Sequence, residues 1–202
     1  SLETKHIEAV LKTPKVVPYF DLPLQHIADP VLTAMGRGRK GAELRALLAG
    51  IRERAPEAVL RTTLLVGHPG EGEAEFTELL EYVTEFGFDH LGCFAYQPEA
   101  GTRAARLAAP PAKVARARAR QIMAAQKRVS QSRLKRWVKR EIPVLVLGPH
   151  PDSELVGQAR HAGQAPEVDG VVILTDGQAQ PGTIATCRIT KAHAYDLEGV
   201  LI

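Results

Sequence analysis

The stretch Arg61–Glu71, with the sequence RTTLLVGHPGE, decides the fold of this chain. Five of its first six residues are apolar or β-branched, which is typical of a strand buried on both faces. In the turn Gly67–Gly70 that follows, two glycines bring the backbone close to whatever lies above the strand. Glu71 and Glu73 then place negative charge where a helix begins, which the helix dipole favours. The stretch predicts a strand, a glycine-rich turn and a helix, with the turn at the strand end where α/β proteins bind ligands.

The segments on either side alternate between helical and strand patterns. Helices are predicted over 3–12, 30–35, 42–54 and 72–86, and strands over 16–22, 58–66 and 90–96. Because helices and strands alternate, we expect a parallel sheet with right-handed crossovers.

The pattern changes after a long helix predicted over 112–140. Short strands are expected at 142–148, 154–160, 169–174, 183–191 and 198–202, separated by turns rich in Gly, Pro and Asp. Short strands at this density are typical of a small β-barrel. We therefore predict an α/β domain over 1–140, including the long basic helix at 112–140, and a five-stranded β-barrel domain over 141–202.

Charge is distributed unevenly, although the net charge is only +3. Residues 1–112 carry 12 basic and 15 acidic residues, residues 113–140 carry 11 basic and no acidic ones, and residues 141–202 carry 3 basic and 8 acidic ones. The basic helix fits two readings: an RNA-binding face, or a solvated outer helix whose arginine stems lie over the sheet.

Polar side chains follow each predicted strand of the sheet. Gln25 and His26 end the strand before the opening stretch, and Tyr96 and Gln97 end the strand after it. Parallel strands would bring these ends to one rim, together with the turn after Val66. Such a rim can hold a polar small molecule with an adenosine-like face, although the same turn also fits an ordinary α/β protein.

Several other functions are disfavoured by the sequence. The two cysteines, Cys93 and Cys187, lie too far apart for a local metal motif, so we predict no metal site within the chain and a reducing, cytoplasmic location. His90 and Cys93 would point to opposite faces of a strand. No apolar run is long enough to span a bilayer, and neither a Walker lysine loop nor a serine hydrolase elbow is present.

Four separated segments resemble, in order and spacing, motifs of the radical S-adenosylmethionine methylthiotransferases: Tyr19–His26, Val31–Gly38, Leu60–Glu71 and Gly92–Thr102. Ala165–Gly170, in the predicted barrel, resembles the TRAM domain, an OB-like fold. The resemblance implies the C-terminal half of a partial (βα)6 radical-SAM barrel followed by a TRAM barrel. It also implies an S-adenosylmethionine site formed by Gln25, His26, Arg61, Thr63, Gly67, Pro69, Gly70 and Glu71. Within that set, Arg61 would meet the methionine carboxylate and the turn would meet the adenine. His68 stands where the family usually has phenylalanine.

Two branches of this family differ in substrate. Gln25-His26, where the tRNA adenosine branch (the MiaB type) usually has Gln-Ser, resembles the branch that modifies an aspartate of a small-subunit ribosomal protein (the RimO type). The ending Ala192–Gly199 resembles the same branch. A net charge of −5 over residues 141–202 would also repel tRNA and attract a basic ribosomal protein. We therefore expect methylthiolation of an aspartate β-carbon, with tRNA a less favoured partner and no membrane partner.

The cluster-binding cysteines of this family are missing. The resemblance implies two 4Fe-4S clusters in the intact enzyme, one held by Cys-x-x-x-Cys-x-x-Cys, and this chain contains neither ligand set. We therefore expect part of a methylthiotransferase that is inactive alone. The alternatives are a tRNA adenosine methylthiotransferase and a non-catalytic module that binds the ribosome or RNA.

Overall fold

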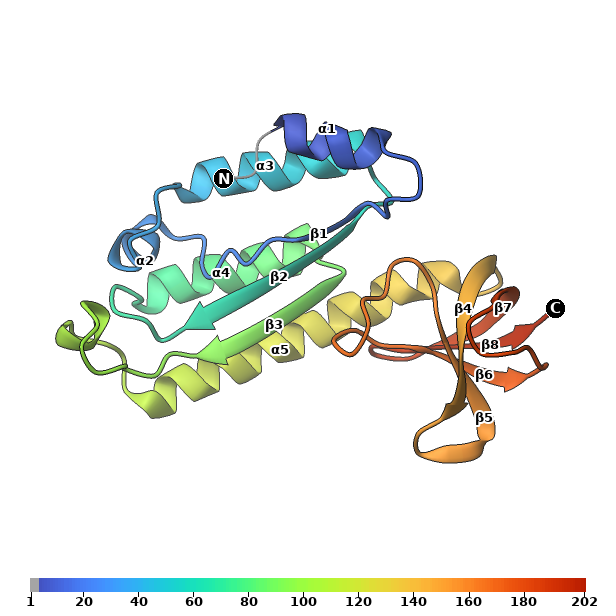
Figure 1. Cartoon of the computed structure of the whole chain (residues 1–202). Helices are drawn as coiled ribbons and strands as arrows, with labels where there is room; N and C mark the ends of the chain where they lie inside the picture. The colour runs from blue at the N-terminus through green and yellow to red at the C-terminus, as the bar shows by residue number, and fades with distance from the viewer. Residues whose placement is uncertain (1–3) are drawn as a thin grey trace. The chain divides into compact units, whose positions relative to one another are not determined.

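The computed structural model describes residues 4–202 of the chain and divides it into two compact units, the first ending at Gln126 and the second running from Lys127 to Ile202 (Figure 1). An α/β unit is followed by a closed β-barrel, which confirms the predicted fold class. The predicted domain boundary at residue 140 stays a prediction, because the α-helix that leads to the barrel continues past Gln126.

The first unit contains a parallel three-stranded sheet with the order β1 (Tyr19–Asp21), β2 (Val59–Val66) and β3 (His90–Ala95). Asp21 pairs with Arg61 across β1 and β2, and Arg61 pairs with His90 across β2 and β3. Thr63 in turn pairs with Gly92. The strand Val59–Val66 is therefore the centre of the sheet, as the sequence predicted.

Helices follow the predicted order. They are α1 (Thr4–Lys12), α2 (Asp29–Ala34), α3 (Gly41–Arg54), α4 (Glu73–Phe86) and α5 (Ala112–Leu134), with short 3-10 helices η1 (Ala104–Arg106) and η2 (Lys135–Trp137). Residue 3 of the first predicted helix lies outside the described residues.

The predicted end of the long helix at residue 140 is wrong. The α-helix ends at Leu134, and a single 3-10 turn follows it. The reason is a long-range contact: the backbone N–H of Lys139 already donates to the carbonyl of Ile189, at 2.8 Å. Sheet pairing therefore takes the chain out of the helix before residue 140.

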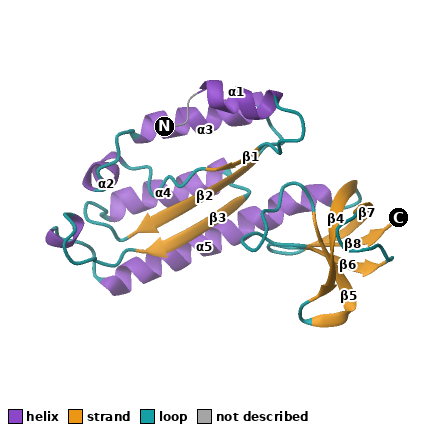
Figure 2. Ribbon diagram, viewed as in Figure 1, coloured by secondary structure: helices purple, strands orange, loops and turns teal. Residues whose placement is uncertain are grey.

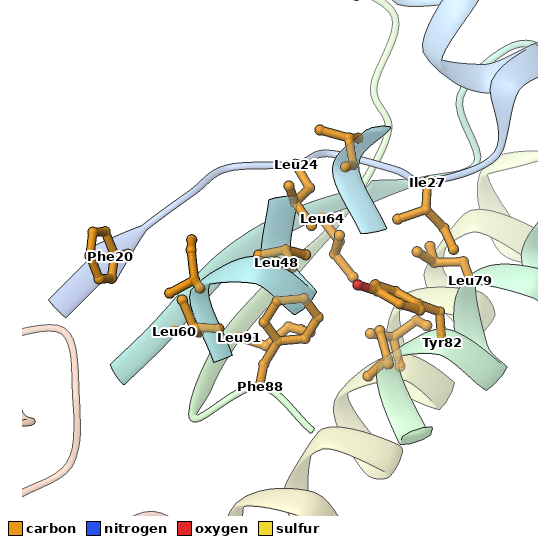
Figure 3. Close-up of a cluster of buried hydrophobic side chains, with 14 of the residues drawn as sticks. Phe20, Leu24, Ile27, Leu48, Leu60, Leu64, Leu79, Tyr82, Phe88 and Leu91 are labelled. Carbon is orange, nitrogen blue, oxygen red and sulfur yellow. The ribbon is translucent and has the colours of Figure 1, made fainter. Parts of the chain in front are cut away.

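The core of the first unit lies between one face of the sheet and the helices (Figure 3). Phe20, Leu60, Leu64 and Leu91 of the strands pack with Leu48 of α3, Leu79 of α4 and Ile122 of α5. Burial alternates along β2, so that every second side chain faces this core and the others face away. Because the side chains alternate between the two faces, the residues of β2 on the opposite face do not take part in this core.

The second unit is a closed barrel with the strand order β4-β5-β6-β8-β7 (Figure 2). Its strands are β4 (Glu141–His150), β5 (Ser153–Arg160), β6 (Val172–Asp176), β7 (Ile184–Ala192) and β8 (Leu197–Leu201). Alternating residues fill the interior, among them Val144, Val172, Cys187, Ile189 and Leu197. Closure leaves no free sheet edge.

Candidate functional site

The chain continues beside β2 after β1 ends. Pro23 cannot donate to the sheet, and the Thr62 hydroxyl bridges the interruption by donating to the carbonyl of Leu22 at 2.8 Å. Beyond it, the N–H of Gln25 donates to the carbonyl of Thr63, and the carbonyl of Gln25 accepts from the N–H of Leu65. Gln25 has a φ of 69°, so the backbone turns sharply at this residue. These bonds bring His26 to the C-terminal end of β2.

His26 and Glu71 meet at this end of the sheet, and both side chains are fully buried. Nε2 of His26 lies 3.2 Å from Oε2 of Glu71, which is ion-pair distance, in a geometry that falls short of a hydrogen bond. Nδ1 of His26 accepts a hydrogen bond from the N–H of Ala28 at 3.0 Å. In a neutral imidazole the proton is then on Nε2, facing the carboxylate.

Arg118, from α5, completes this buried network. Its guanidinium donates to Oε1 of Glu71 at 2.8 Å and to the backbone carbonyl of Glu71 at 3.2 Å. The same guanidinium reaches Glu73 at 3.0 Å and lies over the ring of Phe76. Oε1 of Glu71 also accepts from the N–H of Gly67 at 2.9 Å, so the carboxylate closes its own turn.

Two glycines let this turn pack against neighbouring helices. Gly67 has a φ of 78°, and a Cβ there would lie 2.2 Å from the Cβ of Ala115 on α5. Gly70 has a φ of 90° and approaches the carbonyl of Pro30 on α2. Both positions therefore require glycine for their backbone conformation and their close contacts.

The ring of His68 is buried beside Tyr96, at the end of β3. The two rings meet edge to face with centroids 4.8 Å apart. The hydroxyl of Tyr96 is buried and has no hydrogen-bond partner within residues 4–202. The turn after β2 and the end of β3 therefore meet, and the Tyr96 hydroxyl, like His26 Nε2 and Glu71 Oε2, is a buried polar atom without a hydrogen-bond partner among the described residues.

Arg61 and Thr63 lie on the sheet face opposite the core. Their register partners His90 and Gly92 share this face, and Phe94 follows with 62% of its surface exposed. Nε of Arg61 lies 3.5 Å from a carboxylate oxygen of Asp21. A Cβ at Gly92 would meet only the ring of Phe94, at 3.7 Å, which leaves room above the centre of the sheet.

The predicted site residues thus separate into two groups. His26, Gly67, Pro69, Gly70 and Glu71 build the rim, and their two titratable side chains are buried against each other. Arg61 and Thr63 lie on the open face of the sheet, and Gln25 connects the two groups through its backbone bonds to β2.

Arg118 was not found by sequence reasoning. It lies in a run of basic residues that resembled a solvated face. The sequence does contain a signal that Arg118 is buried, namely its position on the helix. Ala115, Arg118, Ile122 and Ala125 lie on one helical stripe, and the other three are core residues. A charged residue on a buried stripe needs a partner, which here is Glu71.

Neither cysteine fits a metal ligand. Burial, with a further contribution from the negative charge of Glu71, raises the pKa of the Cys93 thiol to about 12. Burial raises the pKa of the Cys187 thiol to about 11. Within residues 4–202, no group of three or more His, Cys, Asp or Glu side chains is placed to hold a metal ion. No helix in this range is both long and apolar enough to cross a membrane.

The open face and the rim together suit a small zwitterionic ligand with an aromatic part. Arg61 offers a cation, Thr63 a hydroxyl and Phe94 an exposed ring, while the rim offers the Tyr96 hydroxyl. The buried network of His26, Glu71 and Arg118 holds the rim in place and leaves little of its polar surface for a ligand.

The chain is similar to described proteins along nearly all of its length. Residues 138–202 match the family model of the TRAM domain. A protein from Syntrophobacter fumaroxidans described as "Ribosomal protein uS12 methylthiotransferase RimO" is 46% identical over 197 residues, which covers 97% of this chain and 44% of that protein. Proteins with the same description are 45% identical over 192 residues in Myxococcus xanthus and 46% over 202 residues in a Synechococcus strain.

The matched regions cover 95% and 97% of this chain, and 40% and 41% of the Myxococcus and Synechococcus proteins. The chain therefore spans less than half the length of the curated relatives that it matches. The resemblance to the ribosomal-protein branch is confirmed. Along nearly its whole length the chain is therefore a relative of proteins described as uS12 methylthiotransferase RimO, and its residues 138–202 match the TRAM domain.

Proposed function

We propose that this chain is part of an enzyme that adds a methylthio group to the β-carbon of an aspartate in ribosomal protein uS12, by radical S-adenosylmethionine chemistry. The observation that carries the proposal is identity of 43–46% to several uS12 methylthiotransferases along nearly the whole chain. The rim and the open sheet face fall within this matched region.

Arg61, Thr63 and the rim fit S-adenosylmethionine. The Arg61 guanidinium suits the methionine carboxylate, and the room above Gly92 suits the body of the ligand. The buried Tyr96 hydroxyl has no other partner within residues 4–202 and suits a polar edge of the adenosine. S-adenosylmethionine, when bound, supplies the chemistry that activates the substrate C–H bond. Gly67, Pro69 and Gly70 shape the rim around it, and His26 and Glu71 hold that rim from behind.

The two 4Fe-4S clusters of the intact enzyme do not fit this chain. A cluster needs several thiolates close together, whereas Cys93 and Cys187 belong to different units and have raised pKa values. We place both clusters outside this chain and expect the chain alone to be inactive. Both cysteines are free thiols, which supports a cytoplasmic location.

The TRAM barrel is the proposed docking surface for the basic ribosomal protein. An open groove of about 460 Å³ runs along it, lined by Pro149, Leu155, Thr175, Asp176 and Pro181 among others. Leu155 is 92% exposed, and Asp176 adds a carboxylate to the lining of the same groove. Two of the three basic residues over 141–202, Arg188 and Lys191, pair with Glu141 and Glu198, so the barrel keeps a negative surface that attracts a basic partner.

A chimera tests the reaction. The matching segment of the Syntrophobacter fumaroxidans relative is replaced by this chain, and the chimera is expressed in bacteria that lack their own uS12 methylthiotransferase. Mass spectrometry of uS12 should then show the mass increase of one methylthio group on an aspartate. The same chimera with Arg61→Ala should lose most of this modification, while a Thr183→Ala chimera, altered on the barrel surface, should keep it.

Two outcomes would overturn the proposal. One is a soluble chimera that leaves uS12 unmodified while the unaltered relative modifies it in the same cells. The other is methylthiolated adenosine in tRNA in place of modified uS12, which would favour the tRNA branch. The chain expressed alone should show no iron–sulfur absorbance after anaerobic reconstitution, and a stable four-iron cluster would refute the placement of both clusters elsewhere.

A further inference from the structure

One face of α5 carries basic side chains without partners. Lys113, Arg116, Arg120 and Lys127 are exposed, and none of them forms an ion pair or side-chain hydrogen bond with another residue that the structure describes. We call these four residues the basic face of α5. Arg118 on the same helix behaves differently, because it is buried and bound to Glu71.

Other surfaces of the first unit neutralise their charges locally. Lys12 pairs with Glu8 at 3.1 Å on α1, and Arg45 pairs with Glu78 at 2.8 Å between α3 and α4. On α5 no such partner is possible within the helix, because residues 113–140 contain no acidic residue. The sequence therefore concentrates like charges where their mutual repulsion disfavours the helix.

The spacing of these charges is regular. With about 3.6 residues per turn, positions 113, 116, 120 and 127 fall within an arc of about 60° on one side of the helix. A rise of about 1.5 Å per residue spreads them over roughly 21 Å. A straight row of cations of this length suits a repeating polyanion.

The neighbouring residues argue against a membrane. Interfacial helices place an apolar face in the lipid, whereas the apolar face of α5, with Ala115, Ile122 and Ala125, is buried in the core of its own unit. Val114 is the large apolar side chain exposed near the row, at 36%. A row of cations bordered on α5 by a single large exposed apolar side chain, Val114, points to phosphates rather than lipid.

We propose that the basic face of α5 binds the phosphate backbone of RNA without reading its sequence. The row offers long cationic side chains and no aromatic ring for base stacking, so contacts are to phosphates alone. The proposed substrate is a protein of the ribosome, and this contact would let the enzyme hold it in its RNA-bound form. RNA binding itself does not depend on the proposed methylthiolation and goes beyond it.

Fluorescence anisotropy with the full chain tests this binding. The probes are two labelled single-stranded RNAs of unrelated sequence and one tRNA, titrated over a range of salt concentrations. The variant Lys113→Gln, Arg116→Gln, Arg120→Gln, Lys127→Gln should bind all three at least about tenfold more weakly at low salt. The slope of log Kd against log salt should fall by about 3, since each phosphate contact to a single strand contributes about 0.7.

Two further variants control for charge and folding. Lys12→Gln, Arg37→Gln, Lys40→Gln, Arg54→Gln removes the same charge from exposed positions outside α5 and should bind RNA within about twofold of the unaltered chain. Arg116→Lys, Arg120→Lys keeps the charge and should keep the binding.

Three results would overturn the proposal: no RNA binding at low salt, equal weakening by the control variant outside α5, or a strong preference for tRNA over both other RNAs. Binding of polyglutamate or of phosphatidylserine vesicles as tight as RNA binding would replace RNA by an acidic protein or a lipid surface. None of these results affects whether the chimera modifies uS12, so the two proposals fail separately.

Discussion

Nε2 of His26 lies 3.2 Å from Oε2 of Glu71, although the two residues belong to different βα connections. The contact ties the segment after β1 to the turn after β2, and both side chains are fully buried. Arg118 holds the other carboxylate oxygen from α5. The rim of the proposed cofactor site is therefore fixed by three parts of the first unit at once, before any ligand is bound.

Replacing Glu71 by Gln should destabilise the first unit strongly. The amide keeps the shape and can still accept from the N–H of Gly67, but Arg118 loses the buried charge that compensates it. Breaking a buried pair by removing one partner costs about 3–5 kcal/mol. Urea unfolding followed by circular dichroism would measure the loss.

Glu73→Gln is the matched control for this change. Glu73 binds the same guanidinium, yet its side chain is 83% exposed, so its loss should cost less than about 1 kcal/mol. Equal effects of the two substitutions would show that Glu71 does not hold the rim.

Gly67→Ala should disrupt the turn by two separate effects. The backbone has a φ of 78°, and the new Cβ would clash with the Cβ of Ala115 at 2.2 Å. Strain and overpacking each cost about 1–3 kcal/mol. Gly36→Ala isolates the strain, because Gly36 has a φ of 70° with nothing within 4 Å of a Cβ. The unfolding free energy should therefore fall clearly more for Gly67→Ala, and equal losses would argue against the contact with α5.

The sequence predicted the sheet and the turn because local patterns determine them. The run of apolar and β-branched residues correctly predicted the strand β2, and the glycine positions of the turn follow from its backbone. The predicted burial of β2 on both faces is wrong, because burial alternates along the strand and Arg61 and Thr63 face away from the core. Their order along the chain also predicted a parallel sheet, since helices separate the strands. The barrel strands were predicted from their turns in the same way.

The role of Glu71 could not be predicted from local sequence. In the sequence, Glu71 looked like an acidic residue at the start of a helix, where the helix dipole favours negative charge. In the structure, α4 begins at Glu73 with Gly72 as its N-cap, so Glu71 lies before the helix. The partners of Glu71, namely His26 and Arg118, come from distant parts of the chain. The end of α5 could not be predicted for the same reason, because the backbone hydrogen bond from Lys139 to Ile189, a residue far away in the sequence, determines where the helix stops.

Stability should fall in alkali as the two cysteines titrate. The pKa of Cys93 is raised from 9.0 to about 12 and that of Cys187 from 9.0 to about 11, chiefly by burial. Because the folded-state values lie above the unfolded ones, the stabilisation is complete below pH 9 and is lost as pH rises toward 11 and 12.

Unfolding measured from pH 8 to pH 10 would show this loss. A Cys93→Ala, Cys187→Ala variant should show a flatter dependence over the same range, because it lacks both thiols. The pKa of Tyr82 is also raised, from 10.0 to about 12, so in the unfolded chain Tyr82 titrates at higher pH than the cysteines. Its contribution to the pH dependence is the same in both proteins. An identical pH dependence of the two proteins would contradict the raised thiol pKa values.

Leu155→Ser should weaken binding of purified uS12 to the full chain. Leu155 is 92% exposed and lines the groove of the barrel, so its truncation should cost about 1 kcal/mol of binding free energy, or roughly fivefold in Kd, a loss that only a minority of interface residues exceed. Asp176→Asn should weaken binding more at low salt than at high salt, because its charge attracts the basic partner through solvent. Titration calorimetry at two salt concentrations would measure both effects.

Ile184→Ser provides the control for this surface. Ile184 is 75% exposed on β7 and does not line the groove, so its replacement removes a similar apolar side chain from another part of the barrel. It should leave the affinity for uS12 unchanged within about twofold, which is less than the effect expected of an interface centre. If Ile184→Ser weakens binding as much as Leu155→Ser, the partner contacts β7 and the groove is not its docking site. If neither matters while Asp176→Asn still acts, attraction is long-range and the contact surface lies elsewhere on the protein.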